Sequence, residues 1–388
     1  MRRTVAARPA ARVTVEPATV ALVVSGGLEQ LYQARQWIWP LEELADSVHG
    51  PAGRPVQVIA RDALVAIRLA KETRLPVVHA RTTSQLGRAL GDGALVALYP
   101  NQATLNFQAL ASPGPAHVHL SHGESEKISM VSNQLKAYDV VFTAGRAARD
   151  RIASHLIGFD ASHCVDVGRP QLDEPRTRPA DLRPSASRST LYAPTWEGDS
   201  PEMSYSSLAT AGVQVVESLL ASGRRVIYRP HPQSGTRSAR AREAHRRIVA
   251  LLRQAGGDHV VDEGPTFGWQ WDVADEIIVD LSAVAFDALT LGKPLVVYRP
   301  SAGAHLQPRG LLDAVVTYDR ASAARIVNAL REAASIEVLE RYESLAEFHF
   351  GDTSHGASLS RFTGAVVATA EARGAALASQ ARHQGQQN

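Results

Sequence analysis

The chain has 388 residues, of which 45% are hydrophobic and 21% charged, with a formal net charge of +2. Single hydrophobic cores rarely grow beyond about 250–300 residues, so this length predicts two domains. The small net charge, with arginines spread along the chain, argues against a nucleic-acid partner and favours local anion sites. One cysteine, Cys164, allows no intramolecular disulfide and no multi-cysteine zinc site, which fits a reducing cytoplasm.

The N-terminal segment carries arginines but leads into no long apolar stretch. Val20 to Val24 is a short apolar run followed at once by Ser25-Gly26-Gly27, which is typical of a strand and a turn rather than a signal peptide. No apolar run approaches the roughly 18 residues that a membrane-spanning helix needs. We therefore expect a cytoplasmic protein with a disordered segment at residues 1–16. Any contact of the protein with a membrane would be peripheral, at the inner face of that membrane.

Residues 17–170 alternate apolar runs with stretches of helical periodicity. The predicted strands are 18–24, 56–60, 76–80, 94–99, 116–120, 139–143 and 163–167, and the predicted helices include 28–45 and 146–156. Such alternation predicts a parallel sheet with helices on both faces. Residues 171–190 are rich in proline, arginine and serine and are predicted to form a linker.

A second alternating set occupies residues 191–350. Its predicted strands are one ending at 191–192, then 225–228, 276–280, 295–298 and 314–318, and its helices are 212–221, 239–254, 284–291 and 321–334. The tail 351–388 predicts a helix over 360–378 and a disordered polar end. Two Rossmann-like halves joined by a linker predict an α/β fold of the GT-B class, with parallel sheets facing an interdomain cleft. Ligands of such sheets bind outside the carboxyl ends of the strands.

The first of four polar clusters follows the predicted strand 116–120 and contains His122, Gly123 and Lys127. A histidine held at a turn beyond a strand can act as a general base near neutral pH. Lys127 can direct an ammonium group at phosphate oxygens. A polar surface turn explains the same residues without any function.

Two further clusters follow strands of the second half. One contains Thr195 and Trp196 in a shaped loop, although large aromatic residues usually supply core area. In the other, Arg229 and His231 are each followed by a proline that stiffens the backbone. A guanidinium and an imidazole held in this way suit a diphosphate, whereas a rigid exposed turn is the structural alternative.

The fourth cluster lies where strand 276–280 ends in Asp280-Leu281-Ser282 and a helix begins. Ser282 is a natural N-cap, and the first helical turn offers free N–H groups and the positive dipole end to an anion. Capping alone explains Ser282. All four clusters follow predicted strands, where active sites collect, and this favours a common site.

As a set, these motifs resemble the CDP-glycerol glycerophosphotransferase family, which contains teichoic-acid primases and polymerases. The resemblance extends over roughly residues 116–361, in the family's order. The matching positions are His122, Gly123 and Lys127; Tyr192 to Trp196; His231 and Pro232; Asp280, Ser282, Phe286, Asp287, Lys293 and Pro294; and, more weakly, Gly168 to Pro170 and Gly351 to Ser358. The departures from the family's usual residues are Glu197, Arg229, Pro230, Leu281 and Ala283.

The resemblance implies that an acceptor hydroxyl attacks the polyol-bound phosphorus of a CDP-activated donor and releases CMP, in cell-wall or capsule polymer synthesis. The candidate catalytic residues are His122 as general base, Lys127 to neutralise charge, His231 to hold the diphosphate, and Asp280 to orient a histidine or bind a donor hydroxyl. The candidate donor-binding residues are Gly123, Thr195, Trp196, Arg229, Ser282, Ala283 and Asp287. The implied partners are a CDP-polyol and a lipid-linked or polymer acceptor, the latter received by the N-terminal domain.

No Asp-x-Asp triplet occurs in the chain, which argues against a dedicated metal site of that kind and leaves assistance by a divalent metal open. Two alternatives remain. A GT-B glycosyltransferase or epimerase would use the same cleft for a nucleotide sugar. A non-catalytic nucleotide-binding protein is favoured by Glu197 and Ala283, which depart from the family pattern.

Overall fold

The computed structural model describes residues 19–47, 56–91, 93–121, 123–126, 131–180, 182, 185–198, 204–264, 267–300 and 310–386. The segment predicted to be disordered, 1–16, lies outside these residues. Contacts between residues divide the chain into two compact units. The first unit is Met1–His122, Gln134–Phe142 and Thr363–Asn388, and the second is Gly123–Asn133 and Thr143–Phe362.

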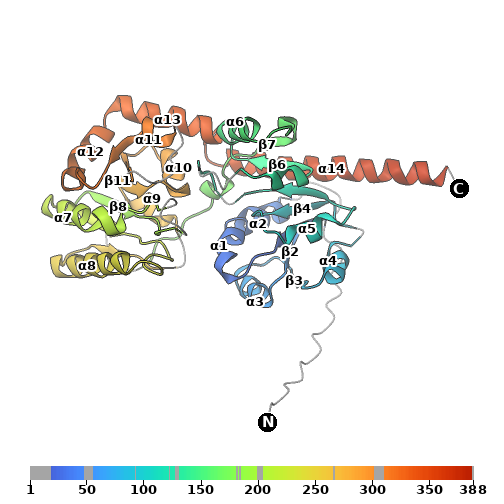
Figure 1. Cartoon of the computed structure of the whole chain (residues 1–388), viewed down its shortest axis with the longest axis horizontal. Helices are drawn as coiled ribbons and strands as arrows, with labels where there is room; N and C mark the ends of the chain where they lie inside the picture. The colour runs from blue at the N-terminus through green and yellow to red at the C-terminus, as the bar shows by residue number, and fades with distance from the viewer. Residues whose placement is uncertain are drawn as a thin grey trace, which may run out of the picture. The chain divides into compact units, whose positions relative to one another are not determined.

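The first sheet has seven strands in the order β3-β2-β1-β4-β5-β6-β7 (Figure 1). They are β1 (Val20–Val24), β2 (Val56–Ala60), β3 (Val77–His79), β4 (Val96–Tyr99), β5 (Ala116–His119), β6 (Val140–Thr143) and β7 (Cys164–Asp166). The pairing is parallel from β3 through β6. The chain reverses its direction of progress across the sheet between β1 and β4, and such switch points are where open sheets bind ligands.

The second sheet has six strands in the order β10-β9-β8-β11-β12-β13, all paired in parallel. They are β8 (Ser189–Ala193), β9 (Arg225–Tyr228), β10 (Val260–Val261), β11 (Glu276–Asp280), β12 (Leu295–Tyr298) and β13 (Val316–Tyr318). The central strands are buried on both faces, as continuous apolar runs such as Ile277 to Val279 require. The switch point of this sheet lies between β8 and β11.

Helices connect the strands and cover the sheets. They are α1 (Leu31–Arg35), α2 (Ile38–Asp46), α3 (Ala63–Glu72), α4 (Thr83–Leu90), α5 (Asn106–Leu110), α6 (Arg146–His155), α7 (Val213–Ala221), α8 (Ala239–Ala255), α9 (Trp269–Val273), α10 (Ala283–Leu289), α11 (Leu311–Ala314), α12 (Ile326–Ala333), α13 (Ile336–Phe350) and α14 (Ala357–Gly385). In the second unit, α7, α8 and α12 lie on one face of the sheet, and α9, α10 and α13 on the other (Figure 1). The fold class predicted from the alternation of strands and helices is confirmed.

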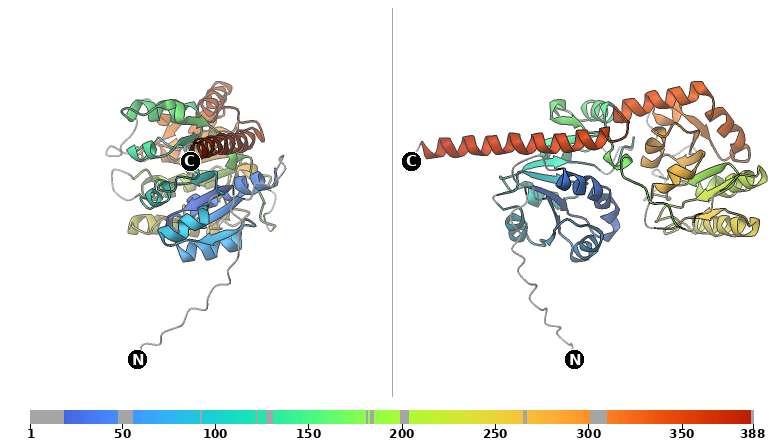
Figure 2. Two further views of the ribbon diagram at one scale, coloured as in Figure 1. Left: turned by 90° about the vertical axis from the view of Figure 1, so that its right-hand side faces the viewer. Right: turned by 180° about the vertical axis from the view of Figure 1, so that it is seen from behind.

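Several predicted boundaries differ from the structure. The predicted helix 28–45 is divided into a 3₁₀ turn, α1 and α2, with a break at residues 36–37. The polar end of the chain was predicted to be disordered, but α14 continues to Gly385 as one unbroken helix (Figure 2). This prediction was wrong because the tail is rich in alanine, glutamine and arginine, which favour helix despite their polarity.

The contact-based units also differ from the predicted domain boundaries, which place all of 17–170 in the first domain. Residues from Thr143 group with the second unit, because α6 packs on α13. Gly145 permits this approach, since a Cβ atom there would lie 2.5 Å from the carbonyl oxygen of His349. The contacts assign the tail from Thr363 to the first unit.

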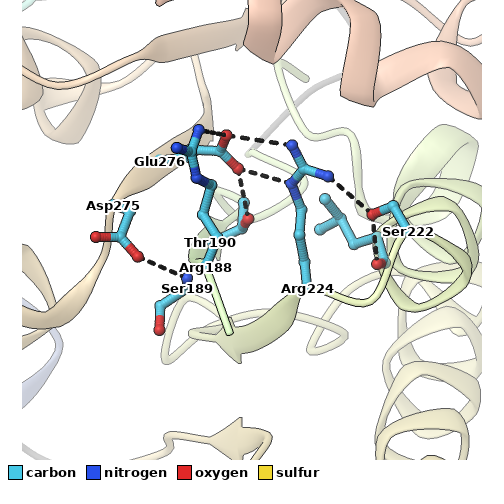
Figure 3. Close-up of polar contacts among 8 residues, drawn as sticks. Arg188, Ser189, Thr190, Ser222, Arg224, Asp275 and Glu276 are labelled. Carbon is cyan, nitrogen blue, oxygen red and sulfur yellow. Dashed lines mark hydrogen bonds and ion pairs between the residues drawn. The ribbon is translucent and has the colours of Figure 1, made fainter. Parts of the chain in front are cut away.

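An ion-pair cluster joins strands at the amino end of the second sheet (Figure 3). Glu276, the first residue of β11, is 1% exposed and accepts hydrogen bonds from Arg224 Nε at 2.7 Å and Arg188 Nη1 at 3.1 Å. Thr190 Oγ1 donates to the same carboxylate at 3.1 Å. Burial alone would raise the pKa of Glu276, but the bonds from Arg224 and Arg188 outweigh it and lower the pKa.

Candidate functional site

The register of the second sheet brings three predicted clusters to one edge. Ala193 of β8 pairs with Val279 of β11, and Tyr192 pairs with Tyr228 of β9. Parallel strands end at the same edge of a sheet, so the residues that follow β8, β9 and β11 emerge side by side. These residues include the predicted positions Thr195, Trp196, Arg229, His231 and Ser282.

Asp280 lies beneath this edge and connects two of its loops. Its side chain is fully buried, and Oδ2 accepts hydrogen bonds from the backbone N–H groups of Thr195 at 2.8 Å and Ser207 at 3.0 Å. Burial raises the pKa of Asp280 to about 7, although the bonds from Ser207 and Thr195 act in the opposite direction. Its contacts among the described residues are those of a group that positions the β8 exit, and its catalytic role stays a prediction. Sequence reasoning missed Ser207, which no local motif marks.

Trp196 and His231 lie against each other at the same edge. Their ring centroids are 6.2 Å apart, with planes inclined by 21°. The guanidinium carbon of Arg237 lies 5.7 Å from the centroid of the Trp196 ring. The backbone N–H of Gln233 donates to His231 Nδ1 at 3.1 Å, so the proton of the neutral imidazole lies on Nε2. His231 can therefore act as a hydrogen-bond donor through Nε2.

Arg229 is held more tightly than an exposed turn would require. Its side chain is 8% exposed, and Nη1 lies 3.1 Å from Asp262 Oδ2 and 2.7 Å from the carbonyl oxygen of Gly264. Its guanidinium carbon lies 5.8 Å from the centroid of the Phe267 ring. These contacts fix the loop that follows β10 against β9. A contact between Arg229 and a diphosphate stays a prediction.

Glu197, one of the departures from the family pattern, has a structural partner. Its carboxylate accepts hydrogen bonds from the backbone N–H groups of Gly235 at 3.1 Å, Arg237 at 3.0 Å and Ser238 at 2.9 Å. Burial opposes ionisation here, but these bonds dominate and lower the pKa of Glu197. Because Ser238 caps α8, Glu197 ties the β8 exit to the start of that helix. The departure at Glu197 therefore has a structural reason, and the non-catalytic alternative stays open.

Gly123, Ala283 and Asp287, which are far apart in sequence, meet in the second unit. Gly123 has φ +143°, and a Cβ atom there would lie 3.0 Å from Ala283 Cβ and 3.9 Å from Arg169 Nη2. Arg169 in turn binds Asp287 through two nitrogen atoms, at 3.1 Å and 3.3 Å. Sequence reasoning singled out three of these residues but gave Arg169 no role, because its partner lies 118 positions away.

The start of α10 differs in one respect from the prediction. Ser282 occupies the N-cap position, but its side chain makes no capping hydrogen bond. Its backbone is fully extended, with φ −159° and ψ 177°. The expected cap is therefore absent, and the Ser282 side chain is not used to stabilise the helix.

Two acidic residues attach the segment after Gly123 to the second unit. Glu124 is 2% exposed, and its Oε1 lies 2.6 Å from Arg151 Nη2 and 3.6 Å from His349 Nδ1. Glu126 accepts from the backbone N–H of Leu311 at 2.9 Å and 2.8 Å, and burial raises the pKa of this carboxyl group. The predicted catalytic residues His122 and Lys127 flank this segment and lie outside the described residues.

The described residues contain neither a metal-binding cluster nor a membrane-spanning helix. Within them, no group of three or more histidine, cysteine, aspartate and glutamate side chains is arranged to hold a metal ion. In the same part of the chain, no helix combines the length and apolarity needed to traverse a bilayer.

Two parallel α/β sheets with Rossmann strand order define a GT-B fold. Within that class, residues 116–344 match the family described as CDP-Glycerol:Poly(glycerophosphate) glycerophosphotransferase, and the chain belongs to this family. The match includes every predicted site residue, from His122 to Asp287. Among curated protein sequences, none matches this chain.

Solved structures support the fold at low sequence identity. A variant of the wall teichoic acid polymerase TagF, soaked with CDPG, is 12% identical with a TM-score of 0.60, covering 92% of this chain and 90% of that one. A putative UDP-N-acetylglucosamine 2-epimerase from Listeria monocytogenes is 13% identical with a TM-score of 0.58, covering 90% and 96%. A glycosyltransferase from Rickettsia africae is 12% identical with a TM-score of 0.56, covering 92% and 99%.

Proposed function

We propose that the chain transfers glycerol phosphate, or a related phospho-polyol, from a CDP-activated donor to an acceptor hydroxyl in cell-wall or capsule polymer synthesis. The observation that carries this proposal is the convergence of family-motif residues at one edge of the second sheet. Trp196 stacks on His231, and Thr195 is bonded to Asp280. Three residues beyond Asp280, α10 begins at Ala283, which lies against Gly123.

In this proposal the donor diphosphate lies at that edge. His231 donates from Nε2 to a phosphate oxygen, and Arg229, Ser282 and the start of α10 add donors or positive charge. Thr195, Trp196, Gly123, Ala283 and Asp287 shape the rest of the donor site. Asp280 acts from below as a positioning residue, through its bonds to Thr195 and Ser207.

The reaction needs alignment and charge neutralisation more than covalent assistance. The acceptor oxygen forms a bond to the polyol-bound phosphorus while the bond from that phosphorus to the bridging oxygen of CMP breaks. His122 takes the hydroxyl proton, CMP leaves with the bond electrons, and Lys127 neutralises the developing charge. A divalent metal could supply further charge neutralisation on the diphosphate.

The remaining parts of the proposal concern the acceptor and the place of reaction. We infer that the acceptor is a lipid-linked or polymeric polyol phosphate and that the chain works in the cytoplasm, in peripheral contact with the membrane. The first unit would receive this acceptor, since every candidate donor-binding residue belongs to the second.

A donor panel tests the proposal. The full chain is incubated with CDP-glycerol, CDP-ribitol or a UDP-sugar, each with a polyol-phosphate acceptor, and the released nucleotide is quantified. CMP release from a CDP-polyol, dependent on acceptor and lost in His231→Ala, is expected. Release of UDP from a UDP-sugar, with no CMP from either CDP-polyol, would instead identify a glycosyltransferase, and conversion of the UDP-sugar to its epimer would identify an epimerase. CDP binding without turnover of any donor would identify a non-catalytic nucleotide-binding protein.

A further inference from the structure

Arg61, in the first unit, is a buried cation that has no anionic partner among the described residues. It follows β2 directly, and its residue is 7% exposed. Nη2 donates at 2.7 Å to the carbonyl oxygen of Arg81 and at 2.7 Å to Gln108 Oε1, both of them neutral acceptors. Nε and Nη1 have no hydrogen-bond partner among the described residues. Burying a charge with unpaired donors costs free energy of folding unless a ligand or counter-ion binds to it.

A second unpartnered donor lies beside Arg61. Val24 of β1 pairs with Ala60 of β2, and the Arg61 N–H donates to the Val24 carbonyl at 2.9 Å. Ser25 and Arg61 are the next residues of these paired strands, so they lie at neighbouring strand ends. Ser25 is 6% exposed, and its Oγ has no hydrogen-bond partner among the described residues. Two buried residues at adjacent strand ends therefore carry donor groups that have no partner among the described residues.

Further polar side chains lie near Ser25, at the switch point of the first sheet. Gly26 follows Ser25, and a Cβ atom there would lie 2.0 Å from Gln30 Oε1. Asn101, which comes soon after β4, donates at 2.7 Å to Gln33 Oε1 and at 3.4 Å to Gln30 Oε1. Side chains that follow β1 and β4 thus bond to one another at the switch point, where open sheets of this type bind ligands. The Arg61 guanidinium, from the neighbouring strand end of β2, is bonded to Arg81 after β3 and to Gln108 on α5.

We propose that Arg61 and Ser25 form a binding site for a phosphate group of the acceptor. The planar guanidinium presents parallel N–H groups that match two phosphate oxygens, and the serine hydroxyl adds a third donor. The exposed side chain of Gln108 covers the guanidinium and currently places an amide oxygen at Nη2, where a phosphate oxygen would bind. Ligand entry requires this side chain to move. Burial also lowers the pKa of Arg61, which a bound anion would reverse.

The assignment to the acceptor rests on the proposed function, whereas phosphate binding at Arg61 does not. The family match begins at residue 116, so it covers none of these residues. The candidate donor site lies wholly in the second unit, and Arg61 and Ser25 belong to the first. A polyol-phosphate acceptor carries its negative charge on phosphate groups, and this is the chemistry that the site recognises.

Calorimetry on the full chain tests the site, with glycerol 3-phosphate as the probe and saturating CDP present to fill the donor site. Wild type is expected to bind glycerol 3-phosphate but not glycerol. Arg61→Gln should weaken binding at least about tenfold, and Ser25→Ala about fivefold. Arg35→Gln is the matched control, because Arg35 pairs with Glu72 at 2.6 Å on the surface of the same unit and removing it changes the net charge equally.

Thermal unfolding shows whether each variant is folded. If Arg61→Gln does not fold, Arg61→Lys keeps the charge without the bidentate geometry and should also weaken binding. The proposal is overturned if wild type binds no probe in the presence of CDP, if CDP displaces the probe, or if Arg35→Gln weakens binding as much as Arg61→Gln.

The two proposals fail in different ways. Phosphate binding that depends on Arg61, in a chain that turns over no CDP-polyol, would support the phosphate site and reject the transferase. Transfer that survives Arg61→Gln with an unchanged KM for the acceptor would reject the acceptor site and leave the transferase in place.

Discussion

The indole of Trp196 stacks on the imidazole of His231, with ring centroids 6.2 Å apart, although 35 positions of chain separate the two residues. The contact is formed because β8 and β9 are neighbours and both end at the same edge of the sheet. With Nδ1 accepting from the Gln233 N–H, the stacked ring can turn only Nε2 toward a ligand as a donor. The Gln233 N–H thus determines which nitrogen of His231 can donate, and Trp196 lies against one face of the ring.

We expect His231→Ala and His122→Ala each to lower turnover by about 100-fold or more, the scale of acid–base and electrostatic groups. Trp196→Ala should lower it by roughly 3- to 10-fold, since an aromatic pair contributes about 0.5–1.5 kcal/mol, and Trp196→Phe should retain most activity. Steady-state CMP release measures each effect, and circular dichroism checks the fold. Turnover at the wild-type rate in a folded histidine variant would remove that histidine from the mechanism.

Asp280 should make stability depend on pH. Burial raises its pKa to about 7, so the native state retains a proton that the unfolded chain has released. The resulting stabilisation is complete below about pH 4, the unfolded pKa, and is lost as the pH rises through 7. Between these values, the free energy of unfolding of wild type should fall relative to Asp280→Asn by about 1.4 kcal/mol per pH unit. Urea unfolding at pH 5, 6 and 8 measures the free energy of unfolding of both proteins. A difference between them that does not change with pH would contradict the prediction.

Gly123→Ala tests the contact between the first motif and α10. Gly123 has φ +143° and an added Cβ would lie 3.0 Å from Ala283 Cβ, so we expect the segment to shift and turnover to fall at least about tenfold. Gly223 is the control, because it has φ +74° and nothing within 4 Å of an added Cβ. Gly223→Ala should cost about 1–2 kcal/mol of stability through backbone strain and leave turnover unchanged. Equal losses of turnover in both variants would refute a specific role for Gly123.

The Glu276 cluster should contribute to stability rather than to turnover. Removing one partner of a buried ion pair typically costs about 3–5 kcal/mol, so we expect a loss of this size for Arg224→Ala, whose side chain is 11% exposed. Arg188 is bonded to the same carboxylate but is 61% exposed, and Arg188→Ala should cost less than about 1 kcal/mol. Urea unfolding measures the loss of stability in both variants. An equal effect of the two substitutions would contradict the dependence on burial.

Much of the fold was predictable because buried parallel strands are short apolar runs between clear breaks. Strands 56–60, 225–228, 276–280 and 295–298 were predicted with the same bounds that β2, β9, β11 and β12 have in the structure. The predictions omitted α9, α11, α13 and the two-residue strand β10. The buried positions Val338, Tyr342, Ala346 and Phe350 of α13 recur every four residues, so the sequence carries a helical signal there that the prediction missed.

The candidate site was predictable to the extent that its residues lie beside strand ends. The sequence by itself placed Thr195, Trp196, His231 and Ser282 after strands, because strand ends are marked locally by proline, glycine and polar residues. The tertiary structure alone decided which groups these residues meet. Four contacts of the site join residues that are far apart in the sequence. They are Asp280 with Ser207, Arg169 with Asp287, Glu124 with Arg151, and Glu197 with the start of α8. Their partners follow from strand order and register, which no local pattern of residues encodes.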